Sequence, residues 1–242
     1  MRNQHKRFRY KDLGSIEAAC RELGLQLEFD DDVSNLGHRV NIAGKYAPNA
    51  IAIQPMEGQD GTFEGKPGPL TFRRYERFAR GGAGLIWFEA TAVAPTARAN
   101  PRQLMLNKDT LSSFRRLVAQ TQTAARESCG PHHRPFTVLQ LTHSGRYAKP
   151  EGVPRPIIAF HDPILDGETH VYPDQVPITD AELGNLEDQF ADAAELALEA
   201  GFDAVDVKHC HRYLTSELLA GYTREGKYGG SFENRIRFLI NT

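Results

Sequence analysis

The sequence lacks any long hydrophobic run. No segment approaches the roughly 18 to 20 consecutive apolar residues that a membrane-spanning helix needs. The residues at the N-terminus also lack the apolar core of a secretion signal. These two absences argue against a membrane protein and against a secreted one, so we expect a cytoplasmic address and no membrane partner.

Cysteine and net charge are scarce as well. The three cysteines, Cys20, Cys129 and Cys210, lie far apart without paired spacing, which argues against a disulfide framework and against a CxxC metal site. The 29 basic and 31 acidic residues are interspersed and leave a formal charge of −2. That balance argues against binding of nucleic acid through phosphate neutralisation. We therefore expect no bound metal and no nucleic-acid partner.

What is present is a globular composition in which strands and helices alternate. With 40% hydrophobic and 25% charged residues, the 242-residue chain can bury a sizeable core. Alternating strands and helices predict the α/β class, with a parallel sheet and right-handed crossovers. The predicted strands are residues 51–55, 84–93, 136–141 and 202–208, and helices are expected to begin at Thr71, at Asp109 or Thr110, and at the capping box of Thr179 and Glu182.

The number of these units indicates part of a barrel. A complete (β/α)8 TIM barrel takes about 250 residues, whereas four units and their loops already occupy most of this chain. We expect residues 40–242 to supply about the first four barrel units, and residues 1–39 to form an N-terminal extension. Within these parts the sequence predicts a helix over 15–25 capped by Ser15, a hairpin over 40–50 that covers the closed end of the barrel, and a functional excursion in the proline- and glycine-rich loop over 147–177.

The most informative stretch runs from Glu199 to Phe238. It indicates a buried strand, then a tip that carries His209, His211 and Tyr213, then a long loop and a new helix. In a parallel barrel the carboxyl ends of the strands hold the chemistry. The sequence therefore predicts that the functional side chains of this unit lie directly after its strand.

Two interpretations of this stretch are open. His209 and His211, with His143 and Glu89 at neighbouring strand ends, are typical ligands for the divalent-metal site of a barrel hydrolase. A truncated, inactive remnant or a partner-binding fragment is the other, because half a barrel leaves sheet edges and apolar surface uncovered.

Four separated blocks of the sequence carry a resemblance to a known family. The chain resembles the FMN-dependent Old Yellow Enzyme family, which comprises NADH:flavin oxidoreductases and 2,4-dienoyl-CoA reductases, and the blocks match its N-terminal part. The matching blocks are Pro55-Met56, RRYERFARGGAGLIWFEATAV at residues 73–93, QLTHSGR at residues 140–146, and YGGSFENRIRF at residues 228–238.

The resemblance implies a TIM barrel with FMN across its carboxyl end. It implies that hydride passes from NADH or NADPH through the flavin to an activated alkene or enoyl substrate, a small molecule. The resemblance leaves open whether the protein forms a homo-oligomer. An iron–sulfur cluster would belong only to a C-terminal region outside this chain. By position, the resemblance places Pro55, Met56 and Glu57 beside the flavin and Ala90 near its pyrimidine end, and makes Gln140 a hydrogen-bond partner of that ring.

The same carry-over implies the catalytic residues. Lys208 and His211 would hold the carbonyl oxygen of the substrate, and Tyr213 would donate a proton to the alkene. Such donors suit an oxygen on which negative charge develops. Lys208 stands where the family usually has histidine, and the alternative is a one-residue slip that puts His209 in that role.

Further departures concern Glu57 and the end of the chain. Glu57 stands where the family usually has a small, hydroxyl or thiol residue, so it either tunes substrate choice or lies in a solvated loop. Arg146 is either a ligand contact or a surface or loop-anchoring residue. The family's phosphate-binding elements come from later strands, so we expect this chain by itself to bind FMN weakly or not at all, and to be the N-terminal portion of a longer enzyme or a truncated copy.

Overall fold

The computed structural model describes residues 8–242, and the first seven residues of the predicted extension lie outside the described residues. The chain divides into two compact units, one that ends at Asn35 and one that comprises Leu36–Thr242. Within the described residues, no helix is both long and apolar enough to cross a membrane. The extension over residues 1–39 and the cytoplasmic address stay predictions.

The first unit contains the helix α1 (Leu13–Glu22). Its N-cap is Asp12, whose side chain accepts a hydrogen bond of 2.8 Å from the backbone N–H of Ser15. The predicted cap at Ser15 is therefore wrong, because Ser15 is the third helical residue and returns the capping-box bond to Asp12. A 3-10 turn, η1 (Ser34–Gly37), spans the boundary between the units.

The second unit is built on a four-stranded parallel sheet in the order β3-β4-β5-β6. The strands are β3 (Ala52–Ile53), β4 (Leu85–Ala92), β5 (Phe136–Thr142) and β6 (Ala204–Val207). All four predicted strands are confirmed, although β3 and β6 are shorter than expected. Because neighbours in sequence are also neighbours in the sheet, every connection is a simple crossover through a helix.

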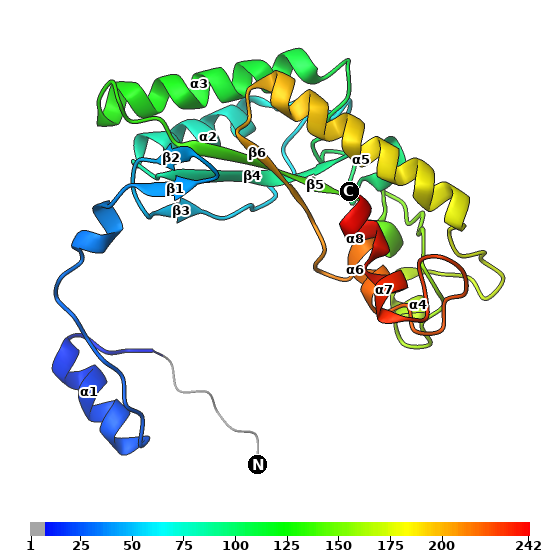
Figure 1. Ribbon diagram of the computed structural model, residues 1–242, viewed down its shortest axis with the longest axis horizontal. Coiled ribbons are helices and arrows are strands. Elements are labelled where there is room, and N and C mark those ends of the chain that lie inside the picture. The colour runs from blue at the N-terminus through cyan, green and yellow to red at the C-terminus, as the bar shows by residue number, and fades with distance from the viewer. Residues whose placement is uncertain (1–7) are drawn as a thin grey trace. The chain divides into compact units, whose positions relative to one another are not determined.

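Three long helices connect these strands: α2 (Pro69–Arg80), α3 (Leu111–Cys129) and α5 (Asp180–Ala200). Figure 1 shows α3 and α5 side by side along one side of the sheet, where α3 also packs on α2. The apolar stripe of each helix supplies the core against this face, as with Tyr75 of α2, Phe114 of α3 and Phe190 of α5 around Phe88 and Leu139 of the sheet. The predicted capping box of Thr179 and Glu182 is present at the start of α5.

The predicted hairpin is also confirmed, as the antiparallel pair β1 (Val40–Ile42) and β2 (Lys45–Ala47). Ala47 packs against Phe136 and Val138, which lie at the start of β5. The hairpin therefore covers the sheet near the amino ends of its strands.

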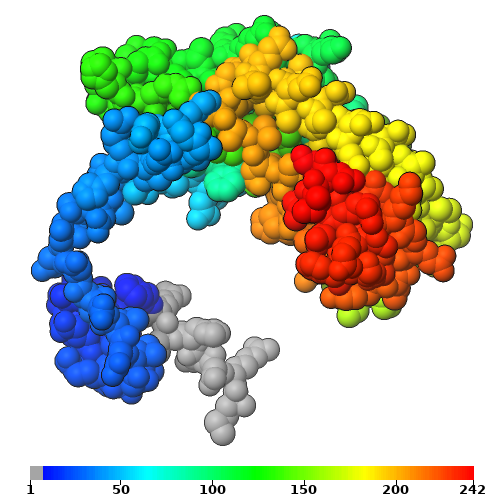
Figure 2. Space-filling view, viewed as in Figure 1, coloured from blue at the N-terminus to red at the C-terminus, as the bar shows by residue number. Residues whose placement is uncertain are grey.

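The loop after β5 and the last segment of the chain are more helical than expected. The loop over 147–177 includes the short helix α4 (Leu165–Thr169), and the stretch after β6 folds into α6 (Leu214–Leu219), α7 (Phe232–Arg235) and α8 (Arg237–Asn241). The predicted long loop is therefore shorter than expected, since α6 follows Tyr213 directly and only residues 220–231 are without helix, whereas the new helix expected after the loop is present as α7 and α8. Figure 2 shows these last residues gathered in one group next to α5, and α8 contacts α5. Short 3-10 turns, η2 (Pro95–Ala97) and η3 (Gly145–Tyr147), follow β4 and β5.

Candidate active site

The predicted site residues lie at one end of the sheet, where the carboxyl ends of its four strands are found. In a parallel sheet all carboxyl ends lie on the same side, so the residues that follow β3 and β6 and those in the second halves of β4 and β5 share that side. We call this group the carboxyl edge, and it consists of Pro55, Met56, Glu57, Ala90, Gln140, Lys208, His211 and Tyr213. The parallel order of the strands thus brings all the predicted positions to one side of the sheet.

Lys208 is the centre of the carboxyl edge. Its side chain is only 5% exposed, and its Nζ lies 3.4 Å from Oε1 of Glu57. The same Nζ lies 4.5 Å from the centre of the Tyr213 ring, which places the ammonium over the aromatic face. Glu57 and Tyr213, from two separate parts of the sequence, therefore both lie against the buried Lys208 side chain.

Tyr213 is half-buried, and its phenol is held in the protonated form. Burial, and after it the negative charge of Glu57, raises the pKa of Tyr213 above its ordinary value of 10. The ring centres of Tyr213 and Tyr147 are 6.0 Å apart. A phenol that keeps its proton at neutral pH can donate it to a substrate.

His211 is exposed and does not reach Lys208 through any direct contact. It has a left-handed backbone with φ 59°, as has Arg212 with φ 57°, so the chain turns sharply at the tip. His211, Tyr213 and Tyr147, together with Ala99 and Lys149, line a pocket of about 200 Å³. Both residues of the predicted pair therefore lie near the Tyr213 ring, Lys208 with its Nζ 4.5 Å and His211 with its ring centre 6.4 Å from the centre of that ring.

Gln140 has a partner that the sequence did not indicate. Its Nε2 donates a hydrogen bond of 2.7 Å to Oδ2 of Asp206, its cross-strand neighbour on β6. This is the single hydrogen bond of the Gln140 side chain within residues 8–242, so its amide oxygen keeps its accepting capacity. The period of two along a strand places Asp206 on the same face as Lys208, a signal that could have identified it.

Ala90 lies at an irregularity of β4. The register between β4 and β5 shifts between Phe88 and Thr91, and such bulges re-aim side chains near functional sites. Ala90 is fully buried, and its carbonyl oxygen accepts a hydrogen bond of 3.0 Å from Nε2 of Gln103. Met56, by contrast, is 72% exposed, and Pro55 is half-buried.

His209 points away from Lys208. Its Nδ1 lies 3.0 Å from the carbonyl oxygen of Val207, its buried Nε2 has no partner among residues 8–242, and its ring faces Phe238 of α8 at 6.4 Å. Burial lowers the pKa of His209 below 6.5. Of the two positions that the sequence left open, Lys208 and not His209 lies against Glu57 and Tyr213.

The other residues of the metal-site interpretation are used within the fold. Glu89 is 1% exposed and binds Arg74, and its Oε2 also accepts a hydrogen bond of 2.9 Å from the backbone N–H of Gly58. His143 is 3% exposed, and its Nδ1 accepts a bond of 3.1 Å from the N–H of Gly145. Across the part of the chain that is described, no three His, Cys, Asp or Glu side chains lie together as a metal ion requires. The hydrolase interpretation thus has no ligand set here.

Arg146 anchors the loop that follows β5. It is 1% exposed, and its guanidinium binds Glu217 of α6, Asp166 of α4 at 2.9 Å and the carbonyl oxygen of Phe160 at 3.1 Å. Of the interpretations left open, the surface one is wrong, because five donors of a buried arginine are satisfied by the protein.

Gly145 fixes how this loop meets the next unit. Its backbone is left-handed with φ 60°, and a Cβ atom there would lie 2.6 Å from the backbone nitrogen of Leu214, far inside normal contact. Leu214 in turn donates a hydrogen bond of 3.2 Å to the carbonyl oxygen of His143. The turn after β5 and the start of α6, next to Tyr213, are therefore in direct backbone contact.

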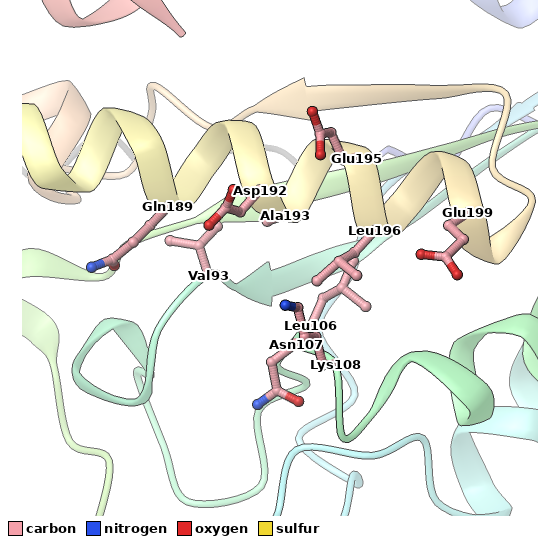
Figure 3. Close-up of a pocket in the computed structure, with 10 residues that line it drawn as sticks. All are labelled: Val93, Leu106, Asn107, Lys108, Gln189, Asp192, Ala193, Glu195, Leu196 and Glu199. Atoms are coloured by element: carbon pink, nitrogen blue, oxygen red, sulfur yellow. The ribbon is translucent and has the colours of Figure 1, made fainter.

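A second pocket lies away from the carboxyl edge residues. It has a volume of about 400 Å³ and lies between α5 and the segment that leads into α3 (Figure 3). Its polar lining includes Asp192, Glu195, Glu199 and Lys108, and none of the predicted site residues. Of the predicted site residues, His211 and Tyr213 line the smaller pocket and none lines this one.

Comparison with known proteins decides the family. Residues 48–242 match the family model described as the NADH:flavin oxidoreductase / NADH oxidase family. The chain belongs to this family. The resemblance drawn from the four sequence blocks is therefore confirmed.

Curated members of the family are similar over most of this chain. An NADPH dehydrogenase of Halalkalibacterium halodurans is 33% identical over 201 residues, which cover 82% of this chain and 55% of that protein. An NADPH dehydrogenase of Bacillus pumilus is 34% identical over 204 residues, with the same coverage of 82% and 55%. The chain thus spans about half the length of the curated family members that it matches.

Solved structures of family members have the same fold. An Old Yellow Enzyme from a Pichia species superimposes with a TM-score of 0.72 at 22% identity, covering 86% of this chain and 54% of that one. A morphinone reductase in complex with tetrahydroNAD gives a TM-score of 0.67 at 26% identity, covering 86% and 58%. The predicted fold, part of a TIM barrel of the Old Yellow Enzyme type, is confirmed.

Proposed function

We propose that this chain contributes to a NAD(P)H-dependent FMN oxidoreductase that reduces activated alkenes, small molecules in which a carbonyl group polarises the double bond. The observation that carries the proposal is the buried Lys208 ammonium over the Tyr213 ring, on the side of the sheet where such barrels bind ligands. The related proteins are named NADPH dehydrogenases, so NADPH is the first hydride donor to test.

The carboxyl edge fits a flavin at its ring end. The Gln140 side chain is 7% exposed, and its oxygen and second amide hydrogen are available for the polar edge of the ring. Ala90 has no side-chain atom beyond Cβ that would block a flat ring. In this assignment the backbone at Pro55 and Met56 completes the lining. When bound, FMN would supply the redox chemistry, accepting hydride from NAD(P)H and passing it to the alkene.

The side chains of this chain would then perform two tasks. Lys208 and His211 hold the carbonyl oxygen of the substrate, on which negative charge develops as hydride adds to the double bond. Tyr213 is protonated at neutral pH, as a phenol with the ordinary pKa of 10 already is, and donates its proton to the neighbouring carbon; burial raises that pKa further. Glu57 of the carboxyl edge holds Lys208 in place, and the neighbouring Asp206 holds Gln140.

The test uses the full-length protein to which this chain contributes, with added FMN, because the resemblance places the phosphate-binding elements on later strands. We expect a change in the flavin absorbance and fluorescence on binding, and NADPH oxidation that depends on an added enone such as 2-cyclohexenone. Asp206→Ala should weaken FMN binding by releasing Gln140, whereas Glu127→Gln, on the exposed end of α3, should not. A full-length protein that leaves the flavin spectrum unchanged in a large excess of FMN would contradict the proposal.

A further inference from the structure

Two charged residues of the carboxyl edge, Glu57 and Lys208, are in contact. They are 151 positions apart in the chain, yet Nζ of Lys208 and Oε1 of Glu57 lie 3.4 Å apart. Each residue therefore supplies the opposite charge that the other requires.

Burial of Lys208 and Glu57 makes each charge depend on the other. The Lys208 side chain is 5% exposed and that of Glu57 is 17% exposed, so both charges are largely removed from water. An ammonium that is buried to this degree is costly unless a carboxylate compensates it. The Tyr213 ring covers a further side of the ammonium. As a pair, Lys208 and Glu57 present a donor to the substrate oxygen without presenting a net positive charge.

We propose that Glu57 is a specificity-determining residue that makes the site prefer substrates with a neutral carbonyl group over substrates with a carboxylate. The inference rests on the proposed function, in which Lys208 holds the substrate oxygen. A ketone, aldehyde or ester oxygen accepts a hydrogen bond from Lys208 while Glu57 keeps its ion pair. A carboxylate at the same position brings a second negative charge next to Glu57, and the repulsion offsets its attraction to Lys208.

Removing the Glu57 charge should therefore reverse the preference. In Glu57→Gln the amide occupies nearly the same volume, and Lys208 is left as an uncompensated cation. A carboxylate then becomes the natural partner of Lys208, whereas a neutral oxygen gains little. Because specificity is a ratio of two affinities, a general loosening of the site would weaken both ligands and leave the ratio near its original value.

The experiment uses benzoate and benzamide, two ligands of nearly equal shape that differ in charge and that hydride cannot reduce at an alkene. Their affinities for the full chain are measured by calorimetry or by ligand-observed NMR, with FMN and without it. We expect Glu57→Gln to raise the benzoate-to-benzamide affinity ratio at least about tenfold. Glu57→Asp, which keeps the charge, should leave the ratio near that of the wild type.

The matched control is Glu127→Gln. It removes the same charge from an exposed ion pair between Glu127 on α3 and Arg80 at the end of α2, and should leave the ratio unchanged. A ratio that Glu57→Gln does not change, or the absence of binding of either ligand to both chains, would overturn the inference. Failure of FMN to bind while the ratio still shifts would instead overturn the proposed function, so the two failures are distinguishable.

Discussion

Polar side chains at the two ends of the parallel sheet differ in how many hydrogen-bond partners they have. At the amino end, near the hairpin, the buried carboxylate of Asp203 accepts bonds from Arg134 at 3.1 and 3.0 Å, from Lys45 at 3.1 Å, and from the backbone and hydroxyl of Thr137 at 3.0 and 3.1 Å. At the carboxyl end, Gln140 makes one hydrogen bond to a side chain, and Lys208 has one acidic partner.

This contrast separates structural polarity from functional polarity. Burial alone raises the pKa of Asp203, but the bonds from Arg134, Thr137 and Lys45 outweigh it and lower that pKa below its ordinary value. Such a saturated group has no capacity left for a ligand. At the carboxyl end Glu89 and Arg146 are likewise engaged within the fold, whereas the amide oxygen of Gln140 has no hydrogen-bond partner among the described residues, which a fold tolerates mainly where a ligand can supply one.

The strongest challenge to this contrast is Tyr213→Phe, which removes a proton donor and little else from the carboxyl edge. In the FMN-loaded protein we expect alkene reduction to slow by about a hundredfold or more, the usual contribution of a positioned acid. Reduction of the flavin by NADPH should change little. Stopped-flow measurement of the two half-reactions separates these outcomes, and an equal loss in both would remove Tyr213 from its assigned role.

A second test concerns His143, at the carboxyl end of β5. Burial lowers its pKa to about 4, whereas the unfolded chain binds a proton near pH 6.5. As pH falls from about 6.5 to about 4 the unfolded state therefore binds the proton first, and the free energy of unfolding should decrease by about 3 kcal/mol from this group.

His143→Asn checks this expectation, since its side-chain oxygen can accept the bond from Gly145 without titrating in this range. Urea unfolding of both proteins between pH 4 and pH 7 gives the comparison, and parallel curves would show that His143 is not the group responsible.

The two aspartates of the strand β6 region test the contrast in stability. Asp203→Ala removes a carboxylate with several partners, and we expect it to lower the free energy of unfolding by about 2 to 3 kcal/mol. Lys45 and Arg134 are half-exposed and can return to water, which limits the loss. Asp206→Ala removes a single bond to Gln140 and should cost about 1 kcal/mol or less. Chemical denaturation measures both changes in the free energy of unfolding. Equal decreases for the two variants would mean that the carboxylates at the two ends of the sheet contribute alike to stability.

The smallest effect is expected at the surface of the loop after β5. The hydrogen bond to Asp166 raises the pKa of His161, although its side chain is 39% exposed. Its stabilising contribution should be present below pH 6.5 and disappear as pH rises through the raised pKa, and exposure limits it to a few tenths of a kcal/mol. NMR titration of the His161 ring measures the pKa directly, and a value at or below 6.5 would contradict the assignment.

The elements of the fold were predictable because their signals are local. Apolar runs identified all four strands, and the Thr179 capping box located the start of α5. The Ser15 cap was wrong because Asp12, three residues earlier, offers a better acceptor and makes Ser15 its capping-box partner. The helix α6 was missed because only six residues of the stretch are helical, too few to give a periodic pattern.

The candidate site was only partly predictable from the sequence. Family resemblance located Lys208, Tyr213 and Gln140, but it could not indicate that Glu57 lies against Lys208, since that contact joins strands at opposite edges of the sheet. The partner of Gln140, Asp206, depends on the register between β5 and β6, which the two strands determine together. Contacts between distant segments leave no periodicity in either segment.

The backbone contact at Gly145 has a consequence for the design of variants of this protein. Libraries that randomise the residues around His143 would include side chains at Gly145 that displace Leu214, and with it the tyrosine one residue before. A substitution in the loop after β5 would then move a residue of the next loop as well. Keeping glycine at that single position should let the neighbouring residues vary while the phenol keeps its place.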